Sequence, residues 1–327
     1  ATAQNVGAIH ELPLHFVPLN KLMSATVEDL ETINGVGEKV AHLSRIAGLL
    51  GQPDLAAGSM RELIARWEAV GPRVRALVAE AEKRAKDKDI ASVLMDPDSI
   101  TFLPPVPDPP KNILCMGLNY KDHVEEGLKT KSITPAQAEM DVPMFFTKAP
   151  ATLVGHRTGI PKHACTDRLD YEAELVVIIG KGGRDIPERK VNDHIFGYCG
   201  GNDVSARDLQ RAHKQIFKGK TLDGTCPLGP YIVPKEDVQD PAKLAVRSWV
   251  NGEPRQNSNT ANMIFSVPAM LSSLSQGFTL EPGDIFMTGT PSGVGYARET
   301  PSFLKPGDVV EIEVEGLGRL VNPVVAA

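Results

Sequence analysis

The chain has 327 residues, of which 42% are hydrophobic and 23% are charged, as expected of a globular protein with an ample core. Its formal net charge of -6 at pH 7 argues against nucleic acid and against an anionic membrane as partners, because both bind to basic protein surfaces. We therefore expect a small-molecule substrate.

Cysteine usage and hydropathy indicate the compartment. The four cysteines, Cys115, Cys165, Cys199 and Cys226, are widely spaced and form no Cys-x-x-Cys pair, which is typical of buried, reduced thiols. No apolar run approaches the roughly 20 residues that cross a bilayer, and the first residues lack the layout of a signal peptide. These features predict a cytoplasmic protein with no membrane partner.

Residues 1–105 form a first region, rich in Ala, Leu, Glu, Lys and Arg, with apolar residues at helical spacing. One apolar stripe covers residues 60–70, and a second covers residues 74–81. Gly71 and Pro72 lie between the two stripes and predict a break in the helix. The pattern predicts a smaller, mostly helical N-terminal region.

One segment of this region suggests a different function. Residues 33–41, Ile-Asn-Gly-Val-Gly-Glu-Lys-Val-Ala, resemble the hairpin of helix-hairpin-helix DNA-binding modules, whose Gly-x-Gly turn offers backbone N–H groups to a phosphate. Acidic residues outnumber basic ones in residues 1–105, so this region would repel a phosphate backbone. We interpret the match as a coincidence and expect no nucleic-acid partner.

Residues 106–327 form the second region, and the proline-rich segment 101–110 marks the boundary. Short β-type runs separated by Gly, Pro and Asp predict an α+β domain of mainly antiparallel strands. The sequence has neither Gly-x-Gly-x-x-Gly after a strand nor Gly-x-x-x-x-Gly-Lys-Ser/Thr, so dinucleotide and P-loop chemistry are not expected. The predicted strands are 113–116, 144–147, 175–179, 195–199, 231–233, 244–250, 285–288 and 309–314.

Two carboxylates, Glu172 and Glu174, lie at the start of the apolar run 175–179. Side chains two residues apart on a strand point to the same face, so these carboxylates would lie side by side. A bound cation such as a metal ion would stabilise this arrangement. From this segment alone, a solvated strand end is an equally good interpretation.

Further polar segments follow the predicted strands. Residues 201–210, Gly-Asn-Asp-Val-Ser-Ala-Arg-Asp-Leu-Gln, place Asp203 just after a strand. Residues 117–126 carry His123 and Glu126 at i, i+3, on one face if the segment is helical. The remaining segments are Lys-Gly-Lys-Thr at 218–221 and the glycine-rich loop 288–295.

In their order and approximate spacing, these segments resemble the fumarylacetoacetate hydrolase family, over residues 108–325. The resemblance implies a mixed β-roll, usually homodimeric, with Mg²⁺ or Mn²⁺ held by Glu172, Glu174 and Asp203. Three hard oxygen ligands with positions left for water suit these metals better than zinc. The chain looks closer to the bacterial acylpyruvase-like branch, because the eukaryotic enzyme that names the family adds a fourth carboxylate ligand and places its histidine differently.

The resemblance and the residue types together predict a metal-dependent hydrolase that cleaves a carbon–carbon bond in a 1,3-diketo acid of the acylpyruvate or fumarylpyruvate type, as in aromatic catabolism. A 2-oxo acid would chelate the metal, and pyruvate would leave as its metal-bound enolate. His123, oriented by Glu126, would be the general base for a water molecule. Lys220 would lie beside the developing enolate. Without the matched segments, His123 and Glu126 would be interpreted as an exposed pair on a helix, and Lys220 as a surface lysine.

Five residues are predicted to contact the substrate. Arg207 and Gln210 could hold a carboxylate or an oxo group. The backbone N–H groups of Gly289 and Thr290 could approach the substrate carboxylate, although a tight turn explains the glycine with no ligand. Lys148 ends a strand and could point into the pocket.

Other reactions use the same electron sink. Decarboxylation of oxaloacetate-type 2-oxo acids and keto–enol or double-bond isomerisation of 2-hydroxymuconate-type diacids would also proceed through an enolate. Hydrolysis ranks first among these reactions. A non-catalytic scaffold that anchors a ligand on the metal is the alternative from a different class, and it would tolerate the loss of His123.

Overall fold

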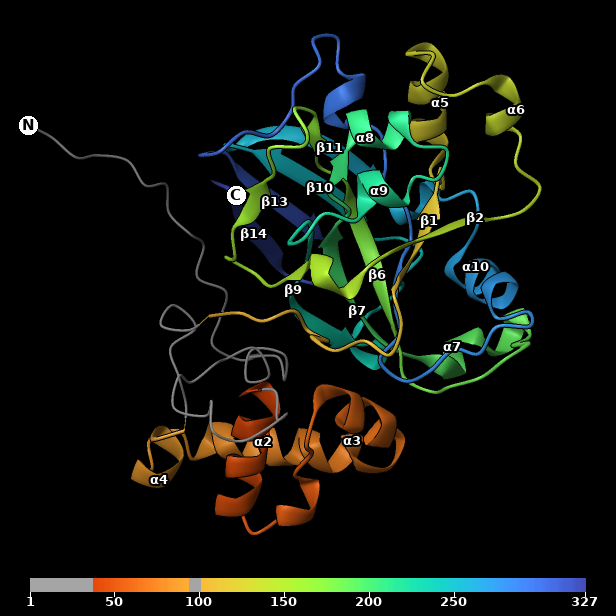
Figure 1. Ribbon diagram of the computed structural model, residues 1–327. Helices are drawn as coiled ribbons and strands as arrows, with labels where there is room; N and C mark the ends of the chain where they lie inside the picture. Colours follow the sequence, from red (N-terminus) through yellow and green to blue (C-terminus); the bar gives the residue numbers. More distant parts are fainter. Residues whose placement is uncertain (1–37, 94–100) are drawn as a thin grey trace, which may run out of the picture.

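The computed structural model describes residues 38–93 and 101–327 (Figure 1). Most of the hairpin-like segment, residues 33–37, lies outside the described residues. Helices α2 to α4 lie at one end of the β-rich part, and helices α5, α8 and α9 lie at the opposite end (Figure 1). The bounds of the N-terminal helical segments are α2 (Glu38–Leu49), η2 (Pro53–Leu55), α3 (Met60–Lys83) and α4 (Lys88–Ala91).

Helix α3 is continuous through Pro72, so the predicted break is wrong. A proline ring clashes with the Cβ atom of the residue before it in a helix, and Gly71 has no Cβ atom. A proline inside a helix costs about 3 kcal/mol through the lost backbone hydrogen bond and the clash of its ring, and burial of apolar side chains on both sides of Pro72 offsets this cost. These buried side chains are Met60, Leu63, Ile64, Trp67 and Val70 before it, and Val74, Leu77, Val78 and Ala81 after it.

Two sheets form the roll, and both mix parallel with antiparallel pairs. The seven-stranded sheet has the order β2-β1-β12-β6-β7-β9-β3, and the five-stranded sheet has the order β11-β10-β13-β14-β4. Only the pairs β1–β12, β3–β9 and β4–β14 are parallel among the described strands. The predicted α+β class, a mixed β-roll of mainly antiparallel strands, is therefore confirmed. The strands are β1 (Ile113–Gly117), β2 (Met144–Lys148), β3 (Leu153–Val154), β4 (Ile160–Lys162), β5 (Leu169–Asp170), β6 (Ala173–Ile179), β7 (Ile195–Asn202), β8 (Ser205–Ala206), β9 (Cys226–Pro234), β10 (Ala245–Val250), β11 (Glu253–Asn259), β12 (Ile285–Met287), β13 (Val309–Val314) and β14 (Arg319–Ala326).

Strand β6 is buried on both faces because it separates two apolar clusters. Leu175, Val177 and Ile179 pack in the cluster that contains side chains of the five-stranded sheet. Val176 and Ile178 point the other way, into a cluster that continues to α2 and α3. This double burial explains why the strand is a continuous apolar run instead of an alternating one. It also fixes the two glutamates at the start of the strand.

Short helices cover the end of the roll where these glutamates lie. The bounds are α5 (Lys121–Lys129), α6 (Pro135–Ala138), α8 (Arg207–Ala212) and α9 (Phe217–Lys220), and the two other short helices are α7 (Val191–His194) and α10 (Val267–Leu274). In the described part of the chain, no helix is long and apolar enough to cross a membrane. Cys115, Cys199 and Cys226 are buried as expected, whereas Cys165 is exposed.

Candidate metal centre and active site

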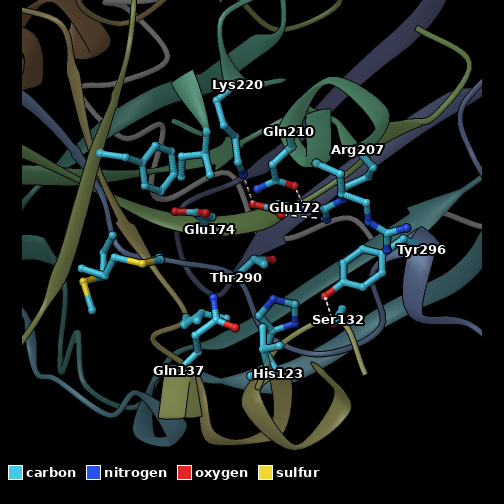
Figure 2. Close-up of a pocket in the computed structure, with 18 residues that line it drawn as sticks. His123, Ser132, Gln137, Glu172, Glu174, Arg207, Gln210, Lys220, Thr290 and Tyr296 are labelled. Atoms are coloured by element: carbon cyan, nitrogen blue, oxygen red, sulfur yellow. Dashed lines mark hydrogen bonds and ion pairs between the residues drawn. The ribbon is translucent and has the colours of Figure 1, made fainter. Parts of the chain in front are cut away.

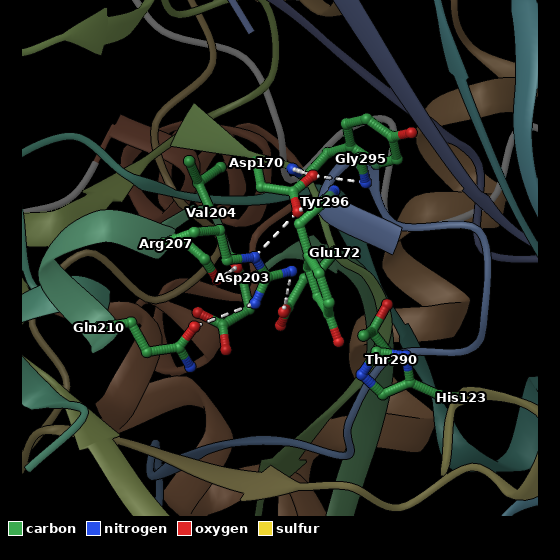
Figure 3. A network of polar contacts seen from close by, with 12 residues as sticks. His123, Asp170, Glu172, Asp203, Val204, Arg207, Gln210, Thr290, Gly295 and Tyr296 are labelled. Carbon is green, nitrogen blue, oxygen red and sulfur yellow. Dashed lines mark hydrogen bonds and ion pairs between the residues drawn. The ribbon is translucent and has the colours of Figure 1, made fainter. Parts of the chain in front are cut away.

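Three carboxylates meet where β6 begins and β7 ends. Figure 2 labels Glu172 and Glu174, and Figure 3 labels Glu172 and Asp203. Glu174 lies on β6, Glu172 lies just before it, and Asp203 follows β7. The antiparallel pairing of β6 with β7 places Glu174 opposite Gly201, and the N–H of Asp203 donates to the backbone oxygen of Glu172 at 3.0 Å. One oxygen from each carboxylate lies within 4.8 Å of the others, and all three residues are buried. The sheet register therefore brings together the three residues that the family resemblance implies as metal ligands.

Two buried lysines contact this group. Lys220 Nζ lies 2.6 Å from Glu172 Oε2 and 2.7 Å from Asp203 Oδ2. Burial alone would lower the pKa of Lys220, but Asp203 and Glu172 outweigh it and raise the pKa well above its usual value. Lys148 Nζ lies 2.8 Å from Asp203 Oδ1. Both ammonium groups therefore form ion pairs with Asp203, and Lys220 also pairs with Glu172.

Glu172 carries a negative charge over the whole neutral range. Burial would raise its pKa, but Lys220 and Arg207 outweigh this effect and lower the pKa to about 2. Arg207 contributes through its Nη2 atom, which lies 2.7 Å from Glu172 Oε1. An ionised carboxylate is the form that binds a metal.

Glu174 is the carboxylate of this group that forms no ion pair within the described residues. Its Oε2 atom accepts one hydrogen bond, from the N–H of Gly289 at 2.7 Å. Burial raises its pKa well above the usual value, and the charges of Asp203 and Glu172 add to that rise. A divalent cation between the three carboxylates would relieve this repulsion, and hard oxygen donors are the ligands that Mg²⁺ and Mn²⁺ prefer. The residues present therefore fit such a metal.

Arg207 is held by a network of buried polar groups (Figure 3). Its Nε atom donates to Asp170 Oδ2 at 2.8 Å, and its Nη1 atom donates to Gln210 Oε1 at 3.2 Å. Asp170 in turn accepts the backbone N–H groups of Gly295 and Tyr296, at 2.7 and 3.1 Å. Arg207 is thus fixed between the metal centre and the glycine-rich loop.

His123 and Glu126 lie on α5, as the spacing predicts, and their side chains contact each other. Glu126 Oε2 lies 3.0 Å from His123 Nδ1, and Glu126 Oε1 accepts the N–H of Gly293 at 2.8 Å. Because an ionised carboxylate can only accept, this contact favours the neutral tautomer with its proton on Nδ1, in which Nε2 is the acceptor. The pair has the arrangement of a general base with an orienting partner.

A cavity of about 300 Å³ joins the histidine to the carboxylates (Figure 2). Its walls include His123, Glu172, Glu174 and Lys220, together with polar side chains that the sequence analysis did not select. These additional side chains are Ser132, Gln137, Arg211 and Tyr296. Arg211 follows Arg207 by four residues on α8, whereas Ser132, Gln137 and Tyr296 belong to no segment with a recognisable ligand spacing and reach the cavity through tertiary contacts.

The predicted substrate contacts fall into two groups. Arg207, Gln210 and Thr290 line the cavity, so they remain candidates. Lys148 does not line it: its ammonium group is fully buried against Asp203 and donates to the backbone oxygen of Val204 at 3.1 Å. It lies too deep to contact the substrate.

Gly289 also differs from its predicted role, because its N–H donates to Glu174 and not towards a substrate carboxylate. The residue has φ +94°, and a Cβ atom there would lie 2.9 Å from the Cβ atom of Asn119. Glycine is therefore required for both the backbone conformation and the close approach.

The comparisons with known proteins agree with this geometry. The family model described as fumarylacetoacetate (FAA) hydrolase C-terminal matches residues 112–325. The chain is similar to the oxaloacetate tautomerase YisK of Bacillus subtilis (strain 168), with 42% identity over 292 residues, which cover 88% of this chain and 93% of the relative.

Two solved structures are also similar to this chain. The fumarylacetoacetate hydrolase of Exiguobacterium antarcticum has a TM-score of 0.67 and 39% identity, covering 84% of this chain and 90% of the other. The 2-hydroxyhepta-2,4-diene-1,7-dioate isomerase of Mycobacterium marinum has a TM-score of 0.60 and 35% identity, covering 71% and 80%. The names of these relatives include a tautomerase, a hydrolase and an isomerase, so the predicted hydrolase reaction is not confirmed. The protein belongs to the fumarylacetoacetate hydrolase family of enzymes, with the catalytic fold over residues 112–325 and a buried carboxylate triad suited to a divalent metal.

Proposed function

We propose that this protein is a metal-dependent tautomerase that interconverts the keto and enol forms of a small 2-oxo acid of the oxaloacetate type. The observation that carries the proposal is that His123, which contacts Glu126, lines the same cavity as Glu172 and Glu174 (Figure 2). A positioned base and a candidate metal centre are the two groups that proton removal beside a carbonyl requires. The 42% identity to a protein named as an oxaloacetate tautomerase supports this reaction over hydrolysis.

The carboxylates of Glu172, Glu174 and Asp203 would hold the metal, for which we propose Mg²⁺ or Mn²⁺ because all three donors are hard oxygen atoms. When bound, such an ion supplies a Lewis acid that stabilises negative charge on the keto oxygen of a 2-oxo acid. Lys220 supports the site through its ion pairs with Glu172 and Asp203, and it helps to lower the pKa of Glu172.

His123 has the central role among the side chains. Its Nε2 atom would take a proton from C3 of the keto form and return one to C3 of the enol form, while Glu126 holds the Nδ1 proton. Arg207 and Gln210 form the polar wall against which the carboxylate of the acid would bind. The cavity of about 300 Å³ lies at the small end of the range for ligand pockets, which favours a small acid.

Hydrolysis of acylpyruvates is the second candidate. The same base could deprotonate a water molecule, and the similar protein from Exiguobacterium antarcticum is described as a fumarylacetoacetate hydrolase. Decarboxylation of oxaloacetate would require no base at C3, so it makes the least use of the His123–Glu126 pair.

Product analysis distinguishes these reactions. We expect the Mn²⁺-loaded protein to accelerate the loss of the ultraviolet absorbance of oxaloacetate enol. In D₂O it should also introduce deuterium at C3 without breaking a carbon–carbon bond. His123→Ala should slow both effects by about 10²–10⁴. Release of pyruvate and a second acid from an acylpyruvate, without any acceleration of enol loss, would instead establish a hydrolase. CO₂ release that keeps pace with the loss of enol would establish a decarboxylase.

A further inference from the structure

We infer that Arg211 binds the second carboxylate of a dicarboxylic 2-oxo acid and makes the site selective for dicarboxylic over monocarboxylic substrates. This inference rests on the proposed function, because it names the substrate class of the same cavity. It concerns the part of the cavity wall that Arg211 and Tyr296 form.

The position of Arg211 follows from the helix that carries it. Arg211 lies four residues after Arg207 on α8, so both side chains leave the helix on the same face, about 6 Å apart at Cβ. Both guanidinium groups pack against one ring, that of Tyr296, with Cζ atoms 4.5 Å (Arg207) and 5.9 Å (Arg211) from the ring centroid. Both residues line the cavity. The ring therefore holds two cations at adjacent positions along one wall.

The two arginines differ in how their charges are satisfied. Arg207 is buried and forms ion pairs with Asp170 and Glu172, at 2.8 and 2.7 Å. Arg211 is exposed at the rim and forms no ion pair with any carboxylate in the described part of the chain. Its positive charge is therefore available to an anion that enters the cavity, whereas that of Arg207 is already shared with two carboxylates.

Tyr296 limits the orientations that Arg211 can adopt. Its hydroxyl group contacts Ser132 Oγ at 3.2 Å, and this contact ties the ring to the segment after α5. An arginine stacked on a fixed ring loses less conformational freedom when it binds a carboxylate than a free surface arginine does. The bound carboxylate would sit at the far end of an acid whose first carboxylate lies by the metal centre.

A purely structural role predicts different behaviour. If Arg211 served only to support the Tyr296 ring, its loss would weaken every ligand of the cavity to a similar extent. If it binds a carboxylate, its loss would weaken only those ligands that carry a second carboxylate. A matched ligand pair separates these two roles.

Malate and 2-hydroxybutyrate of the same configuration form such a pair. Both offer a carboxylate and an adjacent hydroxyl group, neither is enolised, and they differ only in a distal carboxylate that is a methyl group in 2-hydroxybutyrate. Their dissociation constants for the Mn²⁺-loaded protein, measured by calorimetric titration, report binding without any turnover.

We expect the wild-type protein to bind malate more tightly than 2-hydroxybutyrate. Arg211→Gln should weaken malate about 10-fold, the loss of one charge-assisted hydrogen bond at a partly hydrated site, and leave 2-hydroxybutyrate unchanged. Arg211→Lys should retain part of the preference because it keeps the charge. Lys214→Gln removes the same charge from an exposed neighbour outside the cavity lining and should change neither constant.

Equal weakening of both ligands by Arg211→Gln would overturn the inference, as would wild-type protein that binds malate no better than 2-hydroxybutyrate. A preserved preference for malate in a protein that does not accelerate enol loss would overturn the proposed reaction and leave the carboxylate subsite intact. The two failures are therefore distinguishable.

Discussion

The carboxylate of Asp170 connects two parts of the active site. It is fully buried and accepts hydrogen bonds from the backbone N–H groups of Tyr171, Gly295 and Tyr296 as well as from the guanidinium group of Arg207 (Figure 3). Asp170 is thus a positioning residue: it orients Arg207 towards Glu172 and fixes the end of the glycine-rich loop.

Asp170→Asn should lower the free energy of unfolding by about 3 kcal/mol, because it leaves the buried Arg207 with one partner fewer and turns an amide NH₂ group towards donors. Urea denaturation measures the change. Asp193→Asn removes a carboxylate from an exposed pair with Lys190 and should cost less than about 1 kcal/mol. Equal losses in the two variants would contradict the role of Asp170.

The His123–Glu126 pair can be tested separately from the metal centre. His123→Ala and Glu126→Gln should each lower kcat by about 10²–10⁴, the range for loss of a positioned general base, and leave Mn²⁺ affinity nearly unchanged. Because the two residues act as a unit, the double variant should lose little more than either single one. A double loss equal to the product of the single losses would show that they act independently. A raised KM with unchanged kcat in His123→Ala would make His123 a substrate clamp.

At the scale of the elements, apolar patterning predicted some strands and missed others. All eight predicted runs lie in or overlap observed strands, because burial on one or both faces makes them apolar. Strand β11, Glu253–Asn259, was missed because it is a polar edge strand of its sheet. Strand β14, Arg319–Ala326, was missed because Asn322 and Pro323 interrupt its apolar run. The short strands β3, β4, β5 and β8 have two or three residues each, too few for a period.

In the candidate site, too, some residues could be predicted from the sequence and others could not. Glu172, Glu174 and Asp203 could be predicted because the strand period places the two glutamates on one face and the family resemblance joins Asp203 to them. The position of Lys148 could not be predicted. Its side chain turns towards the carboxylate of Asp203, and this contact between residues distant in sequence leaves no local pattern. The roles of Asp170 and Tyr296 depend on contacts between residues more than 100 positions apart, and no local pattern records them.

His156 provides a pH-dependent link between elements. Its Nδ1 atom accepts the N–H of Val321 on β14 at 3.0 Å, and its ring packs edge-on against Phe102. Burial, with a smaller effect from the charge of Arg157, lowers the pKa of His156 from 6.5 to about 4. The folded protein therefore holds this ring neutral, whereas the unfolded chain binds a proton below pH 6.5.

This difference stabilises the fold fully above pH 6.5, and the stabilisation is lost as the pH falls from 6.5 towards 4. Between these values the wild-type protein should lose roughly 3 kcal/mol more unfolding free energy than His156→Gln, which has no titrating ring. Denaturant unfolding across this pH range measures the difference. Parallel stability curves for the two proteins would contradict the assignment.

At the scale of the whole molecule, the N-terminal helices pack on the roll and share a continuous apolar cluster with it. Trp67 of α3 meets Phe196 of β7 edge-on, with ring centroids 5.2 Å apart, and Arg75 lies over the Trp67 ring. Arg75 also forms an ion pair with Asp237, at 2.8 Å. The helices therefore contribute to the stability of the fold from the end opposite to α5, α8 and α9 (Figure 1).

Trp67→Ala should lower the free energy of unfolding by about 3 kcal/mol, because it leaves a cavity in this shared cluster. Mn²⁺ affinity and kcat should be unchanged at temperatures well below the transition, because Trp67 does not line the active-site cavity. Thermal unfolding and steady-state rates check the two parts. A loss of kcat in fully folded protein would show that the helices also act on the site.

The central claim is that a divalent metal held by Glu172, Glu174 and Asp203 makes the protein a catalyst for enolisation of a 2-oxo acid. The direct test is the rate of loss of oxaloacetate enol, measured in chelator-treated protein as Mn²⁺ is added back, for the wild type and for Asp203→Ala. We expect no acceleration without metal, recovery that saturates at one Mn²⁺ per chain, and no recovery in the variant within that range. Full activity in the metal-stripped wild type would contradict the claim.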